Sequence, residues 1–380
     1  MTKIRVVVVD DSVVMRKLIS TALSQDPGIE VIGHAPDGLA ALKRVARLNP
    51  DILTLDVEMP GMDGIATLRE IRKTRPSLPV VMVSAHTKQG AAATINALMA
   101  GANDYVTKPA GEQDIAGSLE VLHRQLVPLI KALCARGRPV VAAAVRVPTV
   151  TAAAPLAPSP ALAPGPKLAL PIRAVCIGIS TGGPQALTAM LPGVPGDFEV
   201  PLLIVQHMPP IFTKTFAESL AHICAIKVHE AVEGQVILPG HAYIAPGGHH
   251  MEVRKLENAC HAHLHDGPPE NSCRPAVDVL FRSAAAVYGG NLLAVVMTGM
   301  GHDGLRGAEV VRAGGGRVMA QDEATSVVWG MPGAVAHGGL AEKLLPLPQI
   351  ASEITQTVRR SFASARGNVG PGRFAGQQAA

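Results

Sequence analysis

IRVVVVDDS, residues 4–12, is the stretch that decides the fold: an apolar run of strand length that ends in two acids and a serine. A run of β-branched residues closed by polar ones is typical of a strand buried on both faces, as in parallel sheets. Residues 13–25 then show helical periodicity, and strand-like and helix-like runs alternate five times up to about residue 133. This alternation predicts an α/β domain with a doubly wound parallel sheet, which binds ligands outside the carboxyl ends of its strands.

The rest of the chain predicts a linker and a second domain of the same class. Residues 137–171 are rich in alanine and proline and lack periodicity, which is typical of an extended linker, and we assign 126–171 to this linker. Residues 172–362 alternate again, with apolar runs such as AVCIGIS and LLAVVMTGM. We therefore expect two doubly wound parallel-sheet domains, residues 1–125 and 172–362, followed by a disordered tail at 363–380.

Composition excludes several classes of function. The net charge is +4, and the linker alone holds five basic and no acidic side chains, so neither domain has the basic footprint of a nucleic-acid-binding protein. We expect no membrane insertion, because no apolar stretch free of charge and proline is long enough, and the N-terminus lacks a signal-peptide pattern. The five cysteines form no paired motif, which favours a reducing, cytoplasmic setting.

Acids and a lysine lie at the strand ends of the first domain. Asp10 and Asp11 follow the first strand, Asp56 ends the third, Ser84 ends the fourth, and Lys108 follows the fifth. Because parallel strands end at one edge of a sheet, we expect these residues to converge. Clustered carboxylates suit Mg²⁺, beside which Asp56 could attack a phosphoryl group while Ser84 and Lys108 hold its oxygens. Each acid alone is more typical of a solvated turn, but the set at successive strand ends predicts a site.

Residues 1–125 resemble the receiver domain of two-component response regulators. The resemblance rests on VDDS, LDVEMPGMDG, VSA and KP, and it implies a flavodoxin-like fold. It also implies a phospho-acceptor at Asp56 that a histidine kinase charges, and an aromatic switch residue at Tyr105. The Mg²⁺ ligands that it implies are Asp10, Asp11, Asp56 and the backbone carbonyl of Glu58. The resemblance identifies a switch and leaves the output open.

The second domain places a serine, a histidine and an aspartate after separate apolar runs. GISTG, residues 178–182, fits the G-x-S-x-G pattern that presents a nucleophile between a strand and a helix, here Ser180. His207 follows the next apolar run and could act as the base, and Asp303 in TGMGHDG could orient it. Their order differs from the Ser, Asp, His order of α/β-hydrolases. Each residue alone is more typical of a turn or a structural role, but together they predict an acyl-transfer site.

Residues 172–360 resemble the chemotaxis receptor protein-glutamate methylesterase domain. The resemblance rests on IGISTGGPQAL, VQHMPPIFTKTFAESL, AYIAPGGHHM, RPAVDVLFRSAA, VVMTGMGHDG and AQDEATSVVWGMPGAV. It implies a Rossmann-like domain with Ser180 as nucleophile, His207 as general acid/base and Asp303 as its orienting partner. It places the backbone of Thr181 and Met300 at the oxyanion site, where preorganised donors are needed.

The resemblance also implies a reaction and its partners. The protein is expected to be a phosphorylation-activated hydrolase in two-component signalling that removes methyl esters from chemoreceptor glutamates, releases methanol and deamidates specific glutamines. The phosphodonor is a chemotaxis histidine kinase and the substrates are methyl-accepting chemoreceptors. Mg²⁺ serves the receiver only, and the esterase step needs no cofactor. We expect the unphosphorylated receiver to cover the cleft of the second domain, with the strand-end edges of both domains facing each other.

Three alternatives remain at this point. A dinucleotide-binding domain is disfavoured because IGISTGG lacks the first G-x-G, and His207 stands where a ribose-binding acid is expected. A DNA-binding regulator disagrees with the charge distribution. An adaptor that keeps the fold without catalysis would be distinguished by a Ser180→Ala variant.

Several histidines and one cysteine lie outside these motifs. The histidines show no familiar zinc spacing, and we expect them to line the cleft or lie on the surface. The loop HLHDGPPENSCRP is expected to border the substrate site, and its Cys273 is more typical of a packing residue than of a redox-sensitive one. These histidines are His241, His249, His250, His261, His263 and His265. The last three alternate along the chain, as residues on one face of a strand do.

Overall fold

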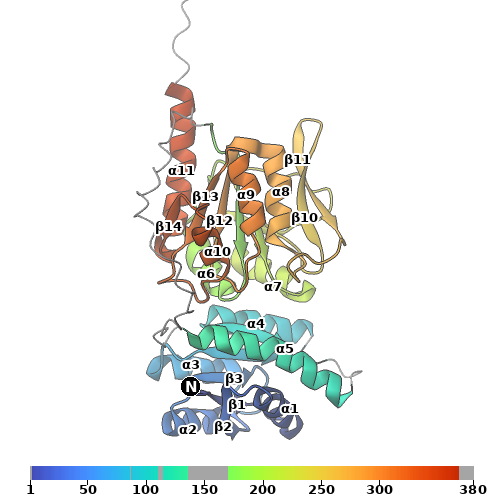
Figure 1. Ribbon diagram of the computed structural model, residues 1–380, viewed down its shortest axis with the longest axis vertical. Coiled ribbons are helices and arrows are strands. Elements are labelled where there is room, and N and C mark those ends of the chain that lie inside the picture. Colours follow the sequence, from blue (N-terminus) through green and yellow to red (C-terminus); the bar gives the residue numbers. More distant parts are fainter. Residues whose placement is uncertain (1, 86, 110–113, 136–169, 368–380) are drawn as a thin grey trace, which may run out of the picture.

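The computed structural model describes residues 2–85, 87–109, 114–135 and 170–367, and contains two parallel sheets flanked by helices (Figure 1). The first sheet has the order β2-β1-β3-β4-β5, and all its neighbouring strands are parallel. The doubly wound fold predicted for the first domain is therefore confirmed. Its strands are β1 (Ile4–Val9), β2 (Ile29–Ala35), β3 (Ile52–Asp56), β4 (Val80–Ser84) and β5 (Asp104–Thr107).

Each helix of this domain begins at a capping residue. The cap side chain accepts a hydrogen bond from the backbone N–H three residues later, which stabilises a helix by about 1 kcal/mol. The caps are Ser12, Asp37, Asp63, Thr87 and Asp114. The helices that follow them are α1 (Val13–Ser24), α2 (Gly38–Leu48), α3 (Gly64–Thr74), α4 (Lys88–Met99) and α5 (Ile115–Cys134).

The second sheet has the order β14-β13-β12-β6-β7-β9-β8 and is also parallel throughout. The chain builds outward from β6 in both directions, so the strand order reverses there. A reversal of this kind opens a crevice at the carboxyl ends of the central strands. The strands are β6 (Ala174–Ile179), β7 (Leu202–Gln206), β8 (Lys227–Glu230), β9 (His241–Ile244), β12 (Leu292–Val296), β13 (Arg317–Gln321) and β14 (Lys343–Leu345).

A separate antiparallel hairpin packs beside this sheet. Its strands, β10 (His250–Leu256) and β11 (Ala259–His265), pair with each other, and β10 packs on α8. His261, His263 and His265 lie on β11, as their alternation predicted. The helices of the second domain are α6 (Gly183–Met190), α7 (Pro210–Ala221), α8 (Val277–Tyr288), α9 (Leu305–Ala313), α10 (Met331–His337) and α11 (Leu347–Gly367).

Two predicted boundaries differ from the structure. Helix α5 continues to Cys134, so the segment 126–134, which was assigned to the linker, is helical. Its buried residues Leu126, Leu129 and Leu133 extend the apolar face of the helix, which explains why it does not stop earlier. Helix α11 continues to Gly367, into the predicted tail. The rest of the linker at 136–169 and of the tail at 368–380 lies outside the described residues.

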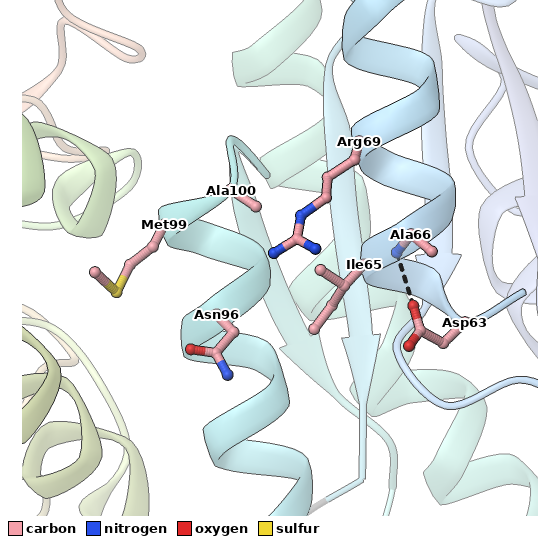
Figure 2. A pocket seen from close by; sticks show the side chains of 7 residues that line it. All are labelled: Asp63, Ile65, Ala66, Arg69, Asn96, Met99 and Ala100. Atoms are coloured by element: carbon pink, nitrogen blue, oxygen red, sulfur yellow. Dashed lines mark hydrogen bonds between the residues drawn. The ribbon is translucent and has the colours of Figure 1, made fainter.

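The two domains share an apolar interface. Helix α4 lies between the sheets and packs against α6 and α7 (Figure 1). The rings of Tyr105 and Phe212 stack across the interface with centroids 4.7 Å apart. Met99 of α4 packs against the apolar cluster that joins the domains, and it points away from the open pocket between α3 and α4 (Figure 2). Within the described residues, no helix is long and apolar enough to cross a bilayer.

Candidate active site

Ser180 and His207 lie side by side at the strand-end crevice of the second sheet. Strands β6 and β7 pair in register up to Ile179 and Gln206, so each candidate residue is the first after its strand. The backbone N–H of His207 donates to the carbonyl of Ile179 at 3.3 Å. The side-chain amide of Gln206 donates to the carbonyls of Ser180 at 3.1 Å and His207 at 3.3 Å, which ties the two turns together.

Asp303 holds the imidazole of His207 by its Nε2 atom. The distance from Nε2 to Asp303 Oδ2 is 2.8 Å, and both side chains are largely buried. Asp303 also accepts hydrogen bonds from the backbone N–H groups of Val277, Asp278 and Gly304. A carboxylate surrounded by donors is held in its ionised form. Nε2 therefore carries a proton, and Nδ1 is left as the atom that can accept one.

The pKa values of this pair follow from the same contacts. Burial alone would lower the pKa of His207, but hydrogen bonds to Asp303 and Cys273 outweigh it and raise the pKa to about 9. Burial acts to raise the pKa of Asp303, and hydrogen bonds from His207 and the backbone lower it below its ordinary value. The pair therefore favours an imidazolium beside a carboxylate, as a base needs after it has taken up a proton.

The loop before α8 brings side chains to this site that the sequence did not reveal. Asn271 Nδ2 lies 2.9 Å from both Asp303 Oδ1 and Asp278 Oδ2, so one amide bridges two buried carboxylates. Cys273 Sγ lies 3.5 Å from His207 Nδ1. The loop borders the site, as expected, and Cys273 contacts the imidazole of His207 directly. Asn271 has a φ of 51° and Ser272 a φ of 63°, a backbone path that sequence patterns for these residues do not predict.

Backbone donors lie next to Ser180. Within the described residues, neither the N–H of Thr181 nor that of Met300 donates to a backbone carbonyl, and Met300 is exposed whereas Thr181 is buried. Gly182 has a φ of 75°, and a Cβ there would lie 2.4 Å from Val327, so the turn requires glycine. Helix α6 begins directly after this turn and directs its positive end at the same place. Ser180 Oγ itself makes no hydrogen bond to a described residue.

The predicted acid pocket of the first domain is assembled at the strand ends. Lys108 Nζ lies 2.8 Å from Asp56 Oδ2 and 3.0 Å from Asp10 Oδ2. Burial and the neighbouring Asp10 raise the pKa of Asp56 to about 6, although Lys108 opposes them. Asp10, Asp11 and Asp56 each offer an oxygen within 4.8 Å of the others, and the buried Asp10 Oδ2 has the Lys108 ammonium beside it. This donor set fits Mg²⁺, which prefers carboxylate oxygens. The Glu58 N–H donates to Asp56 Oδ1 at 3.3 Å.

Ser84 and Tyr105 are not directed at Asp56 in this structure. Ser84 Oγ donates to the carbonyl of Gly90 at 3.2 Å and accepts from Thr94 at 2.6 Å, so it is held by α4. Tyr105 lies in the domain interface, stacked on Phe212. The predicted switch residues therefore contact the elements that face the second domain.

The receiver covers the crevice with a different surface from the predicted one. Strand β5 and α4 face the second domain, whereas Asp56 and Lys108 make their contacts within their own domain. Burial raises the pKa of Asp104, at the start of β5, to about 6, against the opposing hydrogen bonds from the Tyr105 N–H and the Thr181 side chain. The prediction that both strand-end edges face each other is wrong, because only the second domain presents that edge to the interface.

The fold and these two sites define a class of protein: a receiver domain joined to a second α/β domain whose strand-end crevice holds Ser180, His207 and Asp303. Residues 6–120 match the response regulator receiver domain family, and residues 175–354 match the CheB methylesterase family. The chain belongs to the family of protein-glutamate methylesterases/protein-glutamine glutaminases, as its relatives show.

Two relatives match nearly the whole chain. A protein-glutamate methylesterase/protein-glutamine glutaminase from Trichodesmium erythraeum is 47% identical and covers 94% of this chain and 100% of its own. The protein of the same name from a Nocardioides strain is 49% identical over 96% of this chain and 98% of its own. Among solved structures, the Thermotoga maritima CheB methylesterase catalytic domain is 40% identical over 49% of this chain and 98% of its own, with a TM-score of 0.48.

Proposed function

We propose that the protein hydrolyses glutamate methyl esters on chemoreceptors with a Ser180–His207–Asp303 triad under the control of its receiver. The observation that carries the proposal is the 2.8 Å contact from His207 Nε2 to Asp303, beside Ser180 on the adjacent in-register strand. Family membership supports the activity, and this geometry supports the choice of these three residues. The dinucleotide and DNA-binding alternatives have no comparable support.

The reaction follows from Nδ1 of His207, the ring nitrogen that does not contact Asp303. Nδ1 takes the proton of Ser180 Oγ as that oxygen attacks the ester carbonyl, and the imidazolium then protonates the departing methanol. Water, deprotonated by the same nitrogen, hydrolyses the acyl-enzyme and frees Ser180 and the receptor carboxylate. Asp303 stabilises the imidazolium that exists between these steps.

The developing oxyanion is stabilised by the N–H groups of Thr181 and Met300. Neither N–H donates to a backbone carbonyl of a described residue, and α6 begins beside them. A glutamine side chain passes through the same tetrahedral oxyanion and releases ammonia in place of methanol. Deamidation of specific receptor glutamines is therefore the second activity of this site. Neither reaction, as written, uses a metal ion.

Phosphorylation controls access to the triad. A histidine kinase is the phosphodonor, Asp56 is the acceptor, and Lys108 holds the phosphoryl group. Asp10, Asp11 and Asp56, with the Glu58 carbonyl, would hold the Mg²⁺ that neutralises the charge of this group. Phosphoryl oxygens recruit the Ser84 hydroxyl away from Gly90 and Thr94, which shifts α4 where it contacts α6 and α7. The five cysteines all lie in the described part of the chain and form no disulfide there, which favours a reducing setting, and we place the enzyme in the cytoplasm.

Release of methanol from methylated receptor membranes tests the assignment. With a phosphodonor present, Ser180→Ala should lower the rate by at least about a thousandfold, since the nucleophile is gone. Ser219→Ala on α7, away from the crevice, is the matched control and should retain the rate. A Ser180→Ala protein that unfolds at the wild-type temperature yet releases methanol normally would overturn the triad and favour the adaptor alternative.

A further inference from the structure

His207 and Cys273 form a ready pair of metal ligands. Nδ1 of His207 and Sγ of Cys273 lie 3.5 Å apart, and His207, Cys273 and Asp303 each offer a ligand atom within 4.8 Å of the other two. Tetrahedral zinc has bonds of about 2.3 Å to sulfur and about 2.0–2.1 Å to nitrogen, which separates the two ligand atoms by roughly 3.6 Å. The observed spacing therefore accommodates the ion with little movement of either side chain.

The imidazole is already oriented as in a metal site. A histidine that binds zinc usually donates its other ring N–H to a carboxylate, which fixes its tautomer and increases its basicity. His207 Nε2 does this to Asp303 at 2.8 Å, so the lone pair of Nδ1 is directed toward Cys273. Both side chains are partly exposed, which leaves the remaining coordination positions to water.

The backbone that carries the thiol is also held in place. The N–H of Cys273 donates to the carbonyl of Glu270 at 2.8 Å, and the N–H of Glu270 donates to the carbonyl of Cys273 at 3.0 Å. Glu270 is itself fixed by two hydrogen bonds of 2.6 Å from Arg282, and Asn271 anchors the loop to Asp303. A ligand pair held in this way loses little conformational freedom when the ion binds.

We propose that His207 and Cys273 bind Zn²⁺, with Asp303 as the outer carboxylate, and that the bound ion inhibits the esterase. Binding forms one Zn–N and one Zn–S bond. It releases the thiol proton of Cys273 and, where His207 is protonated, the proton on Nδ1. Because protons are released, the affinity for Zn²⁺ increases as the pH rises. The ion occupies the nitrogen that must accept the proton of Ser180. The inhibition rests on the proposed function, whereas the binding does not.

Titration of the full-length protein with Co²⁺, a spectroscopic substitute for Zn²⁺, tests the binding directly. A thiolate-to-cobalt charge-transfer band should saturate at one equivalent and disappear when Zn²⁺ is added. Cys273→Ser should remove the band and weaken Zn²⁺ binding by at least about tenfold. Cys260→Ser, on β11, is the matched control and should keep both. Other histidine pairs, such as His229 and His241, lack a thiolate and give no such band.

Two further measurements separate the parts of the proposal. Ser180→Ala should retain the cobalt band without activity, so failure of the esterase assignment leaves the metal result intact. Zn²⁺ should lower the rate of methanol release by the wild type and by Cys260→Ser equally. The rate of Cys273→Ser should stay close to the rate of the same variant without metal. Absence of the band in the wild type, or its persistence in Cys273→Ser, overturns the site. Equal inhibition of Cys273→Ser overturns the mechanism of inhibition.

Discussion

His207 sets the pH dependence of the proposed esterase. Its base form must accept the proton of Ser180, and a pKa of about 9 leaves it mostly protonated at neutral pH. The active fraction falls about tenfold for each pH unit below the pKa. We therefore predict that kcat/KM of the phosphorylated enzyme rises from neutral pH and levels off above about 9. The measurement is methanol release across that range.

Cys273 provides the internal check on this pH profile. Its hydrogen bond is one of the contacts that raise the pKa of His207, so Cys273→Ala should move the midpoint of the profile to lower pH. Cys260→Ala, which does not touch His207, should leave the midpoint unchanged. An unshifted midpoint in Cys273→Ala would show that Asp303 alone determines the basicity.

The residues that follow strands could be predicted, and those on the irregular loop could not. Asp10, Asp56, Ser180 and His207 each lie at or directly after a strand end, and parallel pairing brings strand ends together whatever the loops do. Asn271 reaches Asp303 only through a loop with positive φ at non-glycine residues, a path that local propensity disfavours.

Helix α4 connects the acid pocket of the first domain to the crevice of the second. Its N-terminal turn holds Ser84, and its far end carries Met99 into the apolar cluster that joins the domains. Met99→Lys should weaken this contact by about 1 kcal/mol, because the apolar side chain is half-buried. We predict about a fivefold rise in the activity of the unphosphorylated protein, measured by methanol release without phosphodonor.

Arg69→Ala is the matched control for Met99. Arg69 lines the same pocket between α3 and α4, but it is exposed and belongs to α3 (Figure 2). The Arg69→Ala substitution should leave the rate of methanol release unchanged, with and without phosphodonor. A Met99→Lys protein with wild-type basal activity would show that α4 does not hold the domains closed.

Buried apolar strands could be predicted most easily, and the edge strands of the second sheet could not. Strands β1, β3 and β4 of the first sheet and the central strands of the second are apolar runs of strand length. Strands β8, with four residues, and β14, with three, lie at the sheet edges, have mixed composition and depend on their neighbours for pairing. The hairpin β10–β11 was visible only as alternating histidines, since its register depends on tertiary packing against α8.

The arrangement of the domains lies beyond what the sequence could predict. Residues 1–125 and 172–362 each show an internal period, but the surface that one domain presents to the other has none. Tyr105 and Phe212 stack in the structure, but in the sequence each is an ordinary aromatic residue of a strand or a helix, with nothing to indicate that they meet. The structure thus replaces the predicted contact between two strand-end edges with the α4–β5 face, and it places Asp104 rather than Asp56 beside Thr181.

Activation should therefore depend on the separation of two intact domains. In the presence of Mg²⁺, a small-molecule phosphodonor should raise methanol release by the full chain, and Asp56→Asn should abolish this response without lowering the basal rate. Burial and Asp10 raise the pKa of Asp56 to about 6, and only the ionised carboxylate attacks phosphorus, so activation should fade as the pH falls through that value.

The fragment 172–380 lacks the covering face and should be at least as active as the phosphorylated chain at every pH. If the fragment were no more active than the unphosphorylated chain, the receiver would control the triad by some means other than covering it.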